Sequence, residues 1–479
     1  MAAGYETRGP PRRHARSLAR TPLPTSWVIA AAAIVAAVTA TRSPWAGVAP
    51  AAVAVLRRRP VLAVALSLLA VAAAARADQA WRSLAPDRLG AVSTWAVVRG
   101  DPQRFPSAMR AVVEVHGERY EVWVRGRARQ QRVAGWRSGD LVRVGGRLEP
   151  LDPDRARRVA WQHVVGELDA DWLGDRFAGD RLASSSNRVR TLIERGASVL
   201  PADLAALARG LIIGDDRDQP PEMVERFRAS GLAHLTAVSG QNVAFLLAAA
   251  GPLLRRARPV PRWLVTLGLI GWFVVLTRAE PSVLRAATMA GLSATAFLLG
   301  RQGSPLRLLA LGVIGLLLID PLLAWAVGFW LSVGATAGVT GIGPWLAPRL
   351  ERLGPLALPV AITIGAQVGV AAPSLLVFGR LSVVGTVANL VAVPVAGLVM
   401  LYGLPACLLA GAVPMIGRFV MIPVAAGVGW VDGVATVAAR LEPPPPWSWL
   451  CWVVVLAAVA AVAAVAGGRR RAARGGPVG

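Results

Sequence analysis

The second half of the chain is hydrophobic almost without interruption, and this feature limits the folds that the chain can adopt. Nine apolar segments follow one another, separated by short loops: residues 232–254, 263–276, 283–299, 306–319, 322–346, 357–378, 382–406, 419–439 and 449–467. A helix of roughly 20 apolar residues crosses the hydrocarbon core of a bilayer. Only 17% of the residues are charged, whereas a soluble domain has roughly 25%. We therefore predict a polytopic α-helical membrane protein whose main membrane domain covers residues 231–467.

The arginines of the chain predict its orientation in the membrane. Three apolar segments, at residues 26–40, 44–56 and 60–75, come first, so we assign residues 1–76 to N-terminal transmembrane helices. Arginines precede the first segment, separate the second from the third, and follow every odd-numbered segment of the later nine. Because arginine and lysine gather in cytoplasmic loops, both termini are predicted to be cytoplasmic. The C-terminus is predicted to be a basic tail at residues 468–479.

Residues 92–173 have a different pattern, with short runs in which apolar and polar residues alternate. The clearest is "GDLVRVGGRLEP" at residues 139–150. Period-two alternation bounded by Gly and Asp indicates β-strands, and several short strands in so few residues favour a small OB-like β-barrel. This domain is inserted after the first transmembrane helices and is predicted to lie outside the cytoplasm. Residues 181–230 have helical periodicity but are too polar to span, so we predict amphipathic interfacial helices there.

One segment of the β domain is a candidate DNA-binding surface. Trp123, Arg125, Arg127 and Arg129 occupy alternate positions, and alternate residues of a strand share one face. An aromatic ring next to arginines suits a single-stranded nucleic acid, because the ring stacks on bases and guanidinium groups contact phosphates. A solvated, arginine-rich hairpin is the alternative interpretation.

The most distinctive string, "GLAHLTAVSGQNV" at residues 231–243, concentrates polar side chains at the start of a predicted span. Polar groups in a membrane usually face a cavity or a partner. They therefore form either a polar constriction on a translocation path or a hydrogen-bonded cluster between helices, and chemistry alone leaves both open. Pro373, Pro394 and Gly403 are expected to break the sixth and seventh spans, which favours a conduit or transporter. The polar residues of the string are His234, Thr236, Ser239, Gln241 and Asn242.

Six strings, taken together, resemble those of the ComEC competence family. Besides the string above, they are "GLIIGDD" at 210–216, "PSVLRA" at 281–286, "GFWLS" at 328–332, "FGRLS" at 378–382, and "ANL" at 388–390 followed by Pro394. The resemblance implies an inner-membrane channel that passes transforming DNA as a single strand. It also marks Gly240, Arg285, Ser332, Asn389 and Pro394 as signature or channel-lining residues. The second histidine of the family signature is replaced here by Gln241-Asn242.

The resemblance also implies partners. These are single-stranded DNA, membrane lipids, a separate DNA receptor and a cytoplasmic translocation motor. A second copy of the chain is a further candidate partner, in a homo-oligomer. Many family members carry a C-terminal metallo-β-lactamase-like domain, whereas this sequence has no HxHxDH-type motif, so we expect a nuclease on another polypeptide. We expect no cofactor, no metal and no catalytic residues.

Two alternatives remain from the residues alone. The first is a secondary transporter of a small solute, which broken helices would favour. The second is an intramembrane hydrolase, in which Asp215, Asp216 and His234 bind a metal or Ser239 pairs with His234. A five-residue separation corresponds to about 7.5 Å of helical rise, which is too far for direct Ser–His contact in an unbroken helix.

Overall fold

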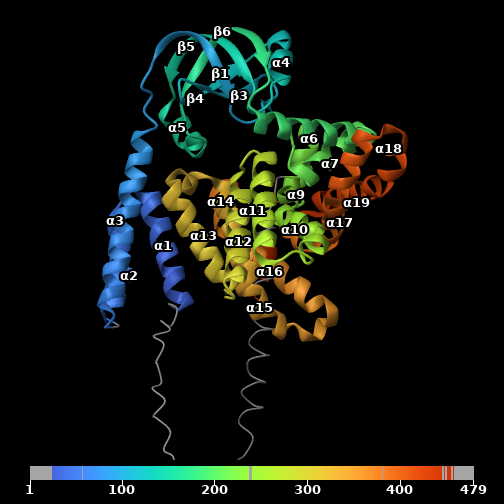
Figure 1. Ribbon diagram of the computed structural model, residues 1–479. Helices are drawn as coiled ribbons and strands as arrows, with labels where there is room; N and C mark the ends of the chain where they lie inside the picture. The colour runs from blue at the N-terminus through green and yellow to red at the C-terminus, as the bar shows by residue number, and fades with distance from the viewer. Residues whose placement is uncertain are drawn as a thin grey trace, which may run out of the picture.

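The computed structural model describes residues 24–454, apart from 57, 237–239, 302, 380, 445–446 and 448–449, together with residue 457. Within these residues a β domain stands over a set of apolar helices (Figure 1). The predicted tail at 468–479 and most of the ninth apolar segment lie outside the described residues.

Three N-terminal helices lead to the β domain. They are α1 (Thr25–Thr41), α2 (Val48–Leu56), which follows a short turn at Pro44–Gly47, and α3 (Pro60–Arg82). Val35 and Val38 of α1 are fully buried and share a hydrophobic core with Ala73 of α3 and Leu317 of α13 (Pro305–Ile319). The 23 residues of α3 rise about 35 Å, and the helix ends below the β domain (Figure 1).

The β domain is a sheet whose strand pairings form a ring. Its strands are β1 (Gly90–Val98), β2 (Gln103–Arg104), β3 (Met109–Val115), β4 (Glu118–Val124), β5 (Leu141–Pro150) and β6 (Val164–Phe177). The order is β1-β5-β6-β4-β3-β2, and β3 pairs with β1 as well. All pairings are antiparallel except that of β4 with β6. Tyr120, Val122 and Leu168 are fully buried in its core. The prediction of a β domain near the N-terminus is therefore confirmed.

Two short helices extend from the sheet, and four more helices connect it to the membrane helices. The first two are α4 (Arg127–Ala134) and α5 (Pro153–Val159), and the connecting four are α6 (Arg181–Ala197), α7 (Ala202–Ile213), α8 (Pro221–Ala229) and α9 (Ala233–Thr236). In Figure 1, α6 lies between the β domain and the helices below it. A Cβ atom at Gly196 of α6 would lie 2.0 Å from the carbonyl oxygen of Cys407, so glycine permits a very close helix crossing there.

The remaining helices form the apolar part of the fold. They are α10 (Gly240–Leu254), α11 (Pro259–Leu276), α12 (Pro281–Leu298), α13, α14 (Val327–Ala337), α15 (Gly343–Leu346), α16 (Ala357–Phe378), α17 (Gly385–Ala412), α18 (Pro414–Val420) and α19 (Ile422–Leu441). Among the described residues, five helical stretches are long and apolar enough to cross a membrane: Pro60–Arg82, Pro259–Leu276, Glu351–Phe378, Gly385–Ala412 and Ile422–Leu441. Helices α1, α10 and α13 are apolar but shorter.

The prediction that proline and glycine break two spans was wrong. Helix α16 continues across Pro373, and α17 continues across Pro394 for 28 residues in all. A single proline removes one backbone hydrogen bond, which a packed helix can tolerate. The irregular backbone lies elsewhere, in a π-helical turn at Gly338–Ile342 between α14 and α15. Such turns are rare and often occur at functional sites.

Candidate functional site

Three of the family-like strings meet around Arg285 of α12. The Arg285 side chain is nearly buried, with 5% of its surface exposed. Its Nε donates a hydrogen bond to Ser332 Oγ at 2.8 Å, and its Nη1 lies 3.2 Å from Met289 Sδ. A Cβ atom at Gly240 would lie 2.8 Å from Arg285 Nη2, so the guanidinium rests against the glycine of the "SGQN" segment. Gly240, Arg285 and Ser332, which meet at this guanidinium, are each separated by more than 40 positions in the sequence.

Arg285 has an unusual electrostatic position for a buried cation. Within the part of the chain that the structure describes, no carboxylate forms an ion pair with it. Its polar neighbours are a neutral hydroxyl and a thioether sulfur. Burying an unpaired charge is costly, and intramembrane ionisable groups usually mark a functional path. The arrangement is suited to an anion that is not part of the protein.

The string "FGRLS" meets the first residue of the signature string at a second point, at the start of α17. Ser382 Oγ donates to the Glu442 carboxylate at 2.7 Å, and the amides of Val383 and Val384 donate to it at 3.0 Å each. The carboxylate thereby satisfies free amides at a helix N-terminus, where negative charge is favourable. Gly231, with φ 72°, packs so closely that a Cβ would lie 3.0 Å from Gly385 Cα. This contact positions helices and needs no ligand.

Asn242 also has a structural position. Its side chain is buried, and Nδ2 donates to the carbonyl oxygens of Leu211 and Ile212 at 3.3 Å each. Both carbonyls belong to the last turn of α7, where helix geometry leaves acceptors unsatisfied. Asn242 therefore ties α10 to the end of α7, and for this residue the geometry favours a helix–helix hydrogen bond.

The other polar residues of the signature string do not form one cluster. The side chains of His234 and Gln241 are exposed. Thr236 Oγ1 donates to the carbonyl of Ala233 in its own helix at 3.0 Å. Ser239 lies outside the described residues.

Asn389 and Pro394 lie in the first half of α17. Asn389 Oδ1 is buried and accepts no hydrogen bond from the described residues. Pro394 is exposed. A buried amide oxygen without a donor is rare in folded proteins, so Asn389 remains a candidate to meet a ligand.

An ionic junction connects the β domain to the helices. Asp101, in the loop after β1, contacts Arg190 of α6 and Arg278, which follows α11, each at 3.0 Å. Arg190 also lies 3.5 Å from Asp215, and Asp215 contacts Arg217 at 2.6 Å. The sequence suggested Asp215 as a metal ligand of the hydrolase alternative and predicted no partner for Arg278. Arg278 follows an even-numbered apolar segment and so lies on the predicted outer side, away from the cytoplasmic arginines. This unusual position was the one sign in the sequence that Arg278 has an acidic partner.

The junction changes the acidity of its carboxyl groups. Burial alone would raise the pKa of Asp101, but the charges of Arg190 and Arg278 outweigh burial and hold this pKa far below its usual range. Burial acts in the same direction on Asp215, and hydrogen bonding and charge from Arg217 lower its pKa to about 2. Both carboxylates are therefore ionised at neutral pH, and the β domain is attached to the helices by charge-assisted contacts.

A further pair of carboxyl groups lies near this junction. Asp216 and Glu280 are accessible to water, yet protein atoms surround Glu280 closely. This desolvation, followed by the negative charge of Asp216, raises the pKa of Glu280 to about 7. Desolvation and the charge of Asp215 also raise the pKa of Asp216.

The four candidate DNA-binding residues do not share one strand face, so that geometric prediction was wrong. Strand β4 ends at Val124, and Gly126 turns the chain with φ 82° into helix α4. Arg125 and Arg127 are exposed. Arg129 instead donates to the carbonyl oxygens of Ala170 and Asp171 at 3.1 and 2.9 Å.

Trp123 is held by neighbours within the β domain. Its Nε1 donates to the buried carboxylate of Glu121 at 2.9 Å, and the guanidinium of Arg155 lies 5.0 Å from its ring centre. The ring of Phe105 lies 4.9 Å away. Of this pair, Phe105 is the more accessible aromatic residue, with 41% of its surface exposed.

The metal-binding alternative finds little geometric support among the described residues. Among the described residues, no group of three or more His, Cys, Asp or Glu side chains could hold a metal ion. The Asp215 carboxylate already contacts two guanidinium groups.

Comparisons with known proteins agree with the resemblance in the sequence. The model of the family described as "Competence protein" matches residues 211–468. The chain is 28% identical over 222 residues to "Uncharacterized protein YcaI" of Escherichia coli K12, covering 44% of this chain and 29% of that protein. It is 28% identical over 200 residues to "ComE operon protein 3" of Bacillus subtilis 168, covering 41% and 25%.

A third relative is "Competence protein ComA" of Neisseria gonorrhoeae, which is 26% identical over 263 residues, 50% of this chain and 37% of that protein. The matches thus span between a quarter and two fifths of the length of these relatives. No solved structure matches the chain significantly. Because the family match covers more than half of the chain, this protein belongs to the competence protein family.

Proposed function

We propose that this protein is a channel in the bacterial cytoplasmic membrane through which single-stranded DNA enters during natural competence. The observation that carries the proposal is the buried guanidinium of Arg285, which has no carboxylate partner in the described part of the chain. A passing phosphodiester can be its transient counterion. The neutral neighbours Ser332 and Met289 leave this charge available to the strand without adding further charges that would hold it.

The β domain supports a role in handling a single strand. Without the two-residue β2, five strands close a ring in which the third and the last strand pair in parallel. We infer that this ring is an OB-like barrel, an architecture that commonly binds oligonucleotides. Phe105 is exposed next to Trp123, and Arg125 and Arg127 are exposed beyond it. Together they supply a stacking surface and phosphate contacts.

The orientation and the partners belong to the same proposal. The protein crosses the membrane several times, with the β domain outside and both termini in the cytoplasm. A separate receptor delivers the DNA, a separate nuclease removes the second strand, and a cytoplasmic motor pulls the strand inward. The protein itself carries no catalytic step.

The test is labelled-DNA uptake by a strain that lacks the protein and receives it, or a variant, from a plasmid. Wild type should restore uptake. Arg285→Met keeps the side-chain volume but removes the charge, and should lower uptake at least tenfold with abundance unchanged, because a lone buried charge does not stabilise the fold. Arg285→Lys should recover part of the uptake.

A matched control is Arg440→Ala, which removes an exposed guanidinium from the last turn of α19. This variant should import DNA like wild type. Failure of wild type to restore uptake would reject the channel, and a small-solute transporter would give that result. Full uptake by Arg285→Met would reject the role of this guanidinium.

A further inference from the structure

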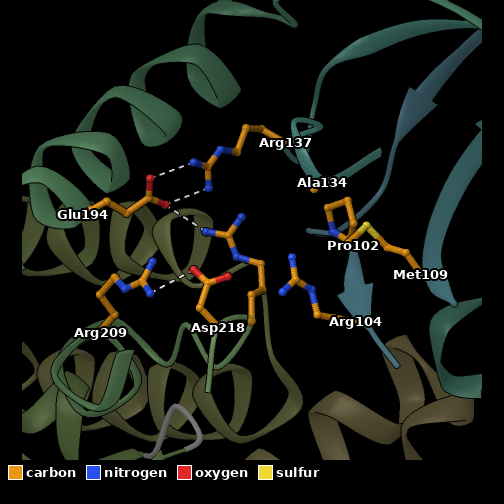
Figure 2. Close-up of a pocket in the computed structure, with 9 residues that line it drawn as sticks. Pro102, Arg104, Met109, Ala134, Arg137, Glu194, Arg209 and Asp218 are labelled. Atoms are coloured by element: carbon orange, nitrogen blue, oxygen red, sulfur yellow. Dashed lines mark hydrogen bonds and ion pairs between the residues drawn. The ribbon is translucent and has the colours of Figure 1, made fainter. Parts of the chain in front are cut away.

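A pocket lies at the seam between the β domain and helices α6 and α7. Its volume is about 130 Å³, enough for several water molecules and therefore for a phosphate group. Figure 2 shows the side chains that surround it. Its lining includes Met109 and six charged residues, which are Arg104, Arg137, Glu194, Arg209, Arg217 and Asp218.

Three of the four arginines in this pocket are held in place by carboxylates. Arg137 donates two hydrogen bonds to Glu194, both at 2.7 Å, and Arg217 donates to the same carboxylate at 2.8 Å. Arg209 contacts Asp218 at 2.9 Å. The guanidinium groups are therefore already oriented, which reduces the entropy lost when a ligand binds. The Asp218 side chain is 53% exposed, so an incoming anion can displace it at little cost.

Arg104 is the exception. It is exposed, and within the described part of the chain its side chain has neither a hydrogen bond nor an ion pair. Its guanidinium points towards the middle of the pocket in Figure 2, on the side opposite Arg137 and Glu194. The register of the β2–β3 pair explains this position, because Arg104 lies opposite Met109 and paired residues share a face of the sheet.

The charges of the lining favour an anion. Four arginines and two carboxylates give a net charge of +2, from 4 − 2. Planar guanidinium groups match the oxygens of a phosphate, and Arg104 brings donors that no carboxylate of the described residues uses. We infer that this pocket binds one backbone phosphate of the incoming DNA strand, at the seam that the strand crosses from the β domain to the helices. This inference rests on the proposed function and adds a contact site to it.

The experiment uses the full-length protein in phosphatidylcholine nanodiscs and a fluorescent oligothymidylate. Loss of one phosphate contact should lower the slope of log affinity against log salt by about 0.7 and weaken binding about fivefold at about 0.1 M salt. Arg104→Ala should show both changes, and Arg104→Lys should recover most of the affinity. Arg147→Ala removes an exposed arginine from β5 outside the pocket and should change neither quantity.

A second arm identifies the anion. Inorganic phosphate that replaces chloride at equal ionic strength should displace the oligonucleotide from wild type more than from Arg104→Ala. Vesicles that contain phosphatidylglycerol should bind both proteins equally. If Arg104→Ala weakens vesicle binding and leaves oligonucleotide binding unchanged, the pocket holds a lipid headgroup and the inference is wrong.

The outcomes separate this inference from the proposed function. Equal affinity and equal salt slope for wild type and Arg104→Ala, in a protein that restores DNA uptake in cells, would overturn the pocket and leave the channel in place. A wild-type protein that neither binds the oligonucleotide nor restores uptake would reject both.

Discussion

Gln241 and Asn242 follow one another at the start of α10, but only Asn242 is buried. The Asn242 amide donates to two carbonyls at the end of α7, while Gln241 extends into accessible space. A polar signature string therefore contains residues with different roles. The sequence alone identified this polar string but could not tell which of its residues have a structural role. The carbonyls that Asn242 contacts belong to a helix about 30 residues earlier in the chain.

Asn242→Ala should destabilise the protein by about 1–3 kcal/mol, because two buried carbonyls lose a donor. Gln241→Ala should leave stability within about 0.5 kcal/mol of wild type, as exposed substitutions usually do. Thermal unfolding in detergent and protein abundance in cells measure both variants. Equal melting temperatures for Asn242→Ala and wild type would contradict the structural role of Asn242.

Glu280→Gln should remove one contribution to the change of protein stability with pH. The pKa of Glu280 is raised to about 7 from an unfolded value of 4.5, so between these values the folded state holds more protons than the unfolded state. This carboxyl therefore reduces stability as pH rises through that window. The melting temperature of Glu280→Gln minus that of wild type should increase from about pH 4.5 to about pH 7 and then stay constant. A constant difference throughout would contradict the raised pKa.

At the scale of elements, α14 and α16 cross with their backbones in contact. A Cβ atom at Gly369 would lie 2.0 Å from the Gly334 carbonyl oxygen, and one at Gly338 would lie 1.9 Å from the Gly365 carbonyl oxygen. Small residues at such positions let membrane helices approach closely. The π-helical turn begins within this crossing, because Gly338 is its first residue.

Gly369→Ala should destabilise the protein by about 1–3 kcal/mol, because the added methyl group forces the backbones apart. Gly328 of α14 is the matched control. A Cβ there meets nothing within 4 Å, so Gly328→Ala should be neutral or stabilising by up to about 1 kcal/mol. Thermal unfolding compares the two variants. Equal effects from both would show that the close crossing does not limit stability.

Local sequence patterns predicted whether a segment forms a helix or a strand. They did not predict where each element ends or which other elements it contacts. Alternation in residues 139–150 predicted a strand where β5 lies, and the helices α11, α12 and α13 begin within four residues of the predicted spans. The alternation of Trp123 and Arg125 failed because Gly126 ends the strand pattern. The pocket around Arg104 was not predictable, because Arg104, Arg137 and Arg209 are separated from one another by more than 30 positions in the chain.

At the scale of the whole molecule, the β domain stands at one end of the helices, and α3 leads the chain to it (Figure 1). Arg255, Arg256 and Arg258 lie near the start of α11. Because arginines gather on the cytoplasmic side, this loop and the β domain are predicted to lie on opposite sides of the membrane.

Reporter fusions test this orientation. A reporter inserted in residues 83–89, after α3, should be active only as an extracytoplasmic enzyme. A reporter inserted in residues 255–258, between α10 and α11, should be active only as a cytoplasmic one. The same signal at both positions would refute the proposed orientation, and immunoblots confirm equal expression.

The contact between Asp101 and Arg278 joins residues that are 177 positions apart in the chain. A ribosome adds roughly 5–20 residues per second, so about 10–35 seconds pass between the synthesis of the two. During this time the strands of the β domain are made, but the carboxylate of Asp101 has no Arg278 to meet. Docking of the β domain is therefore a late step of biogenesis, which completes only after α11 has been made.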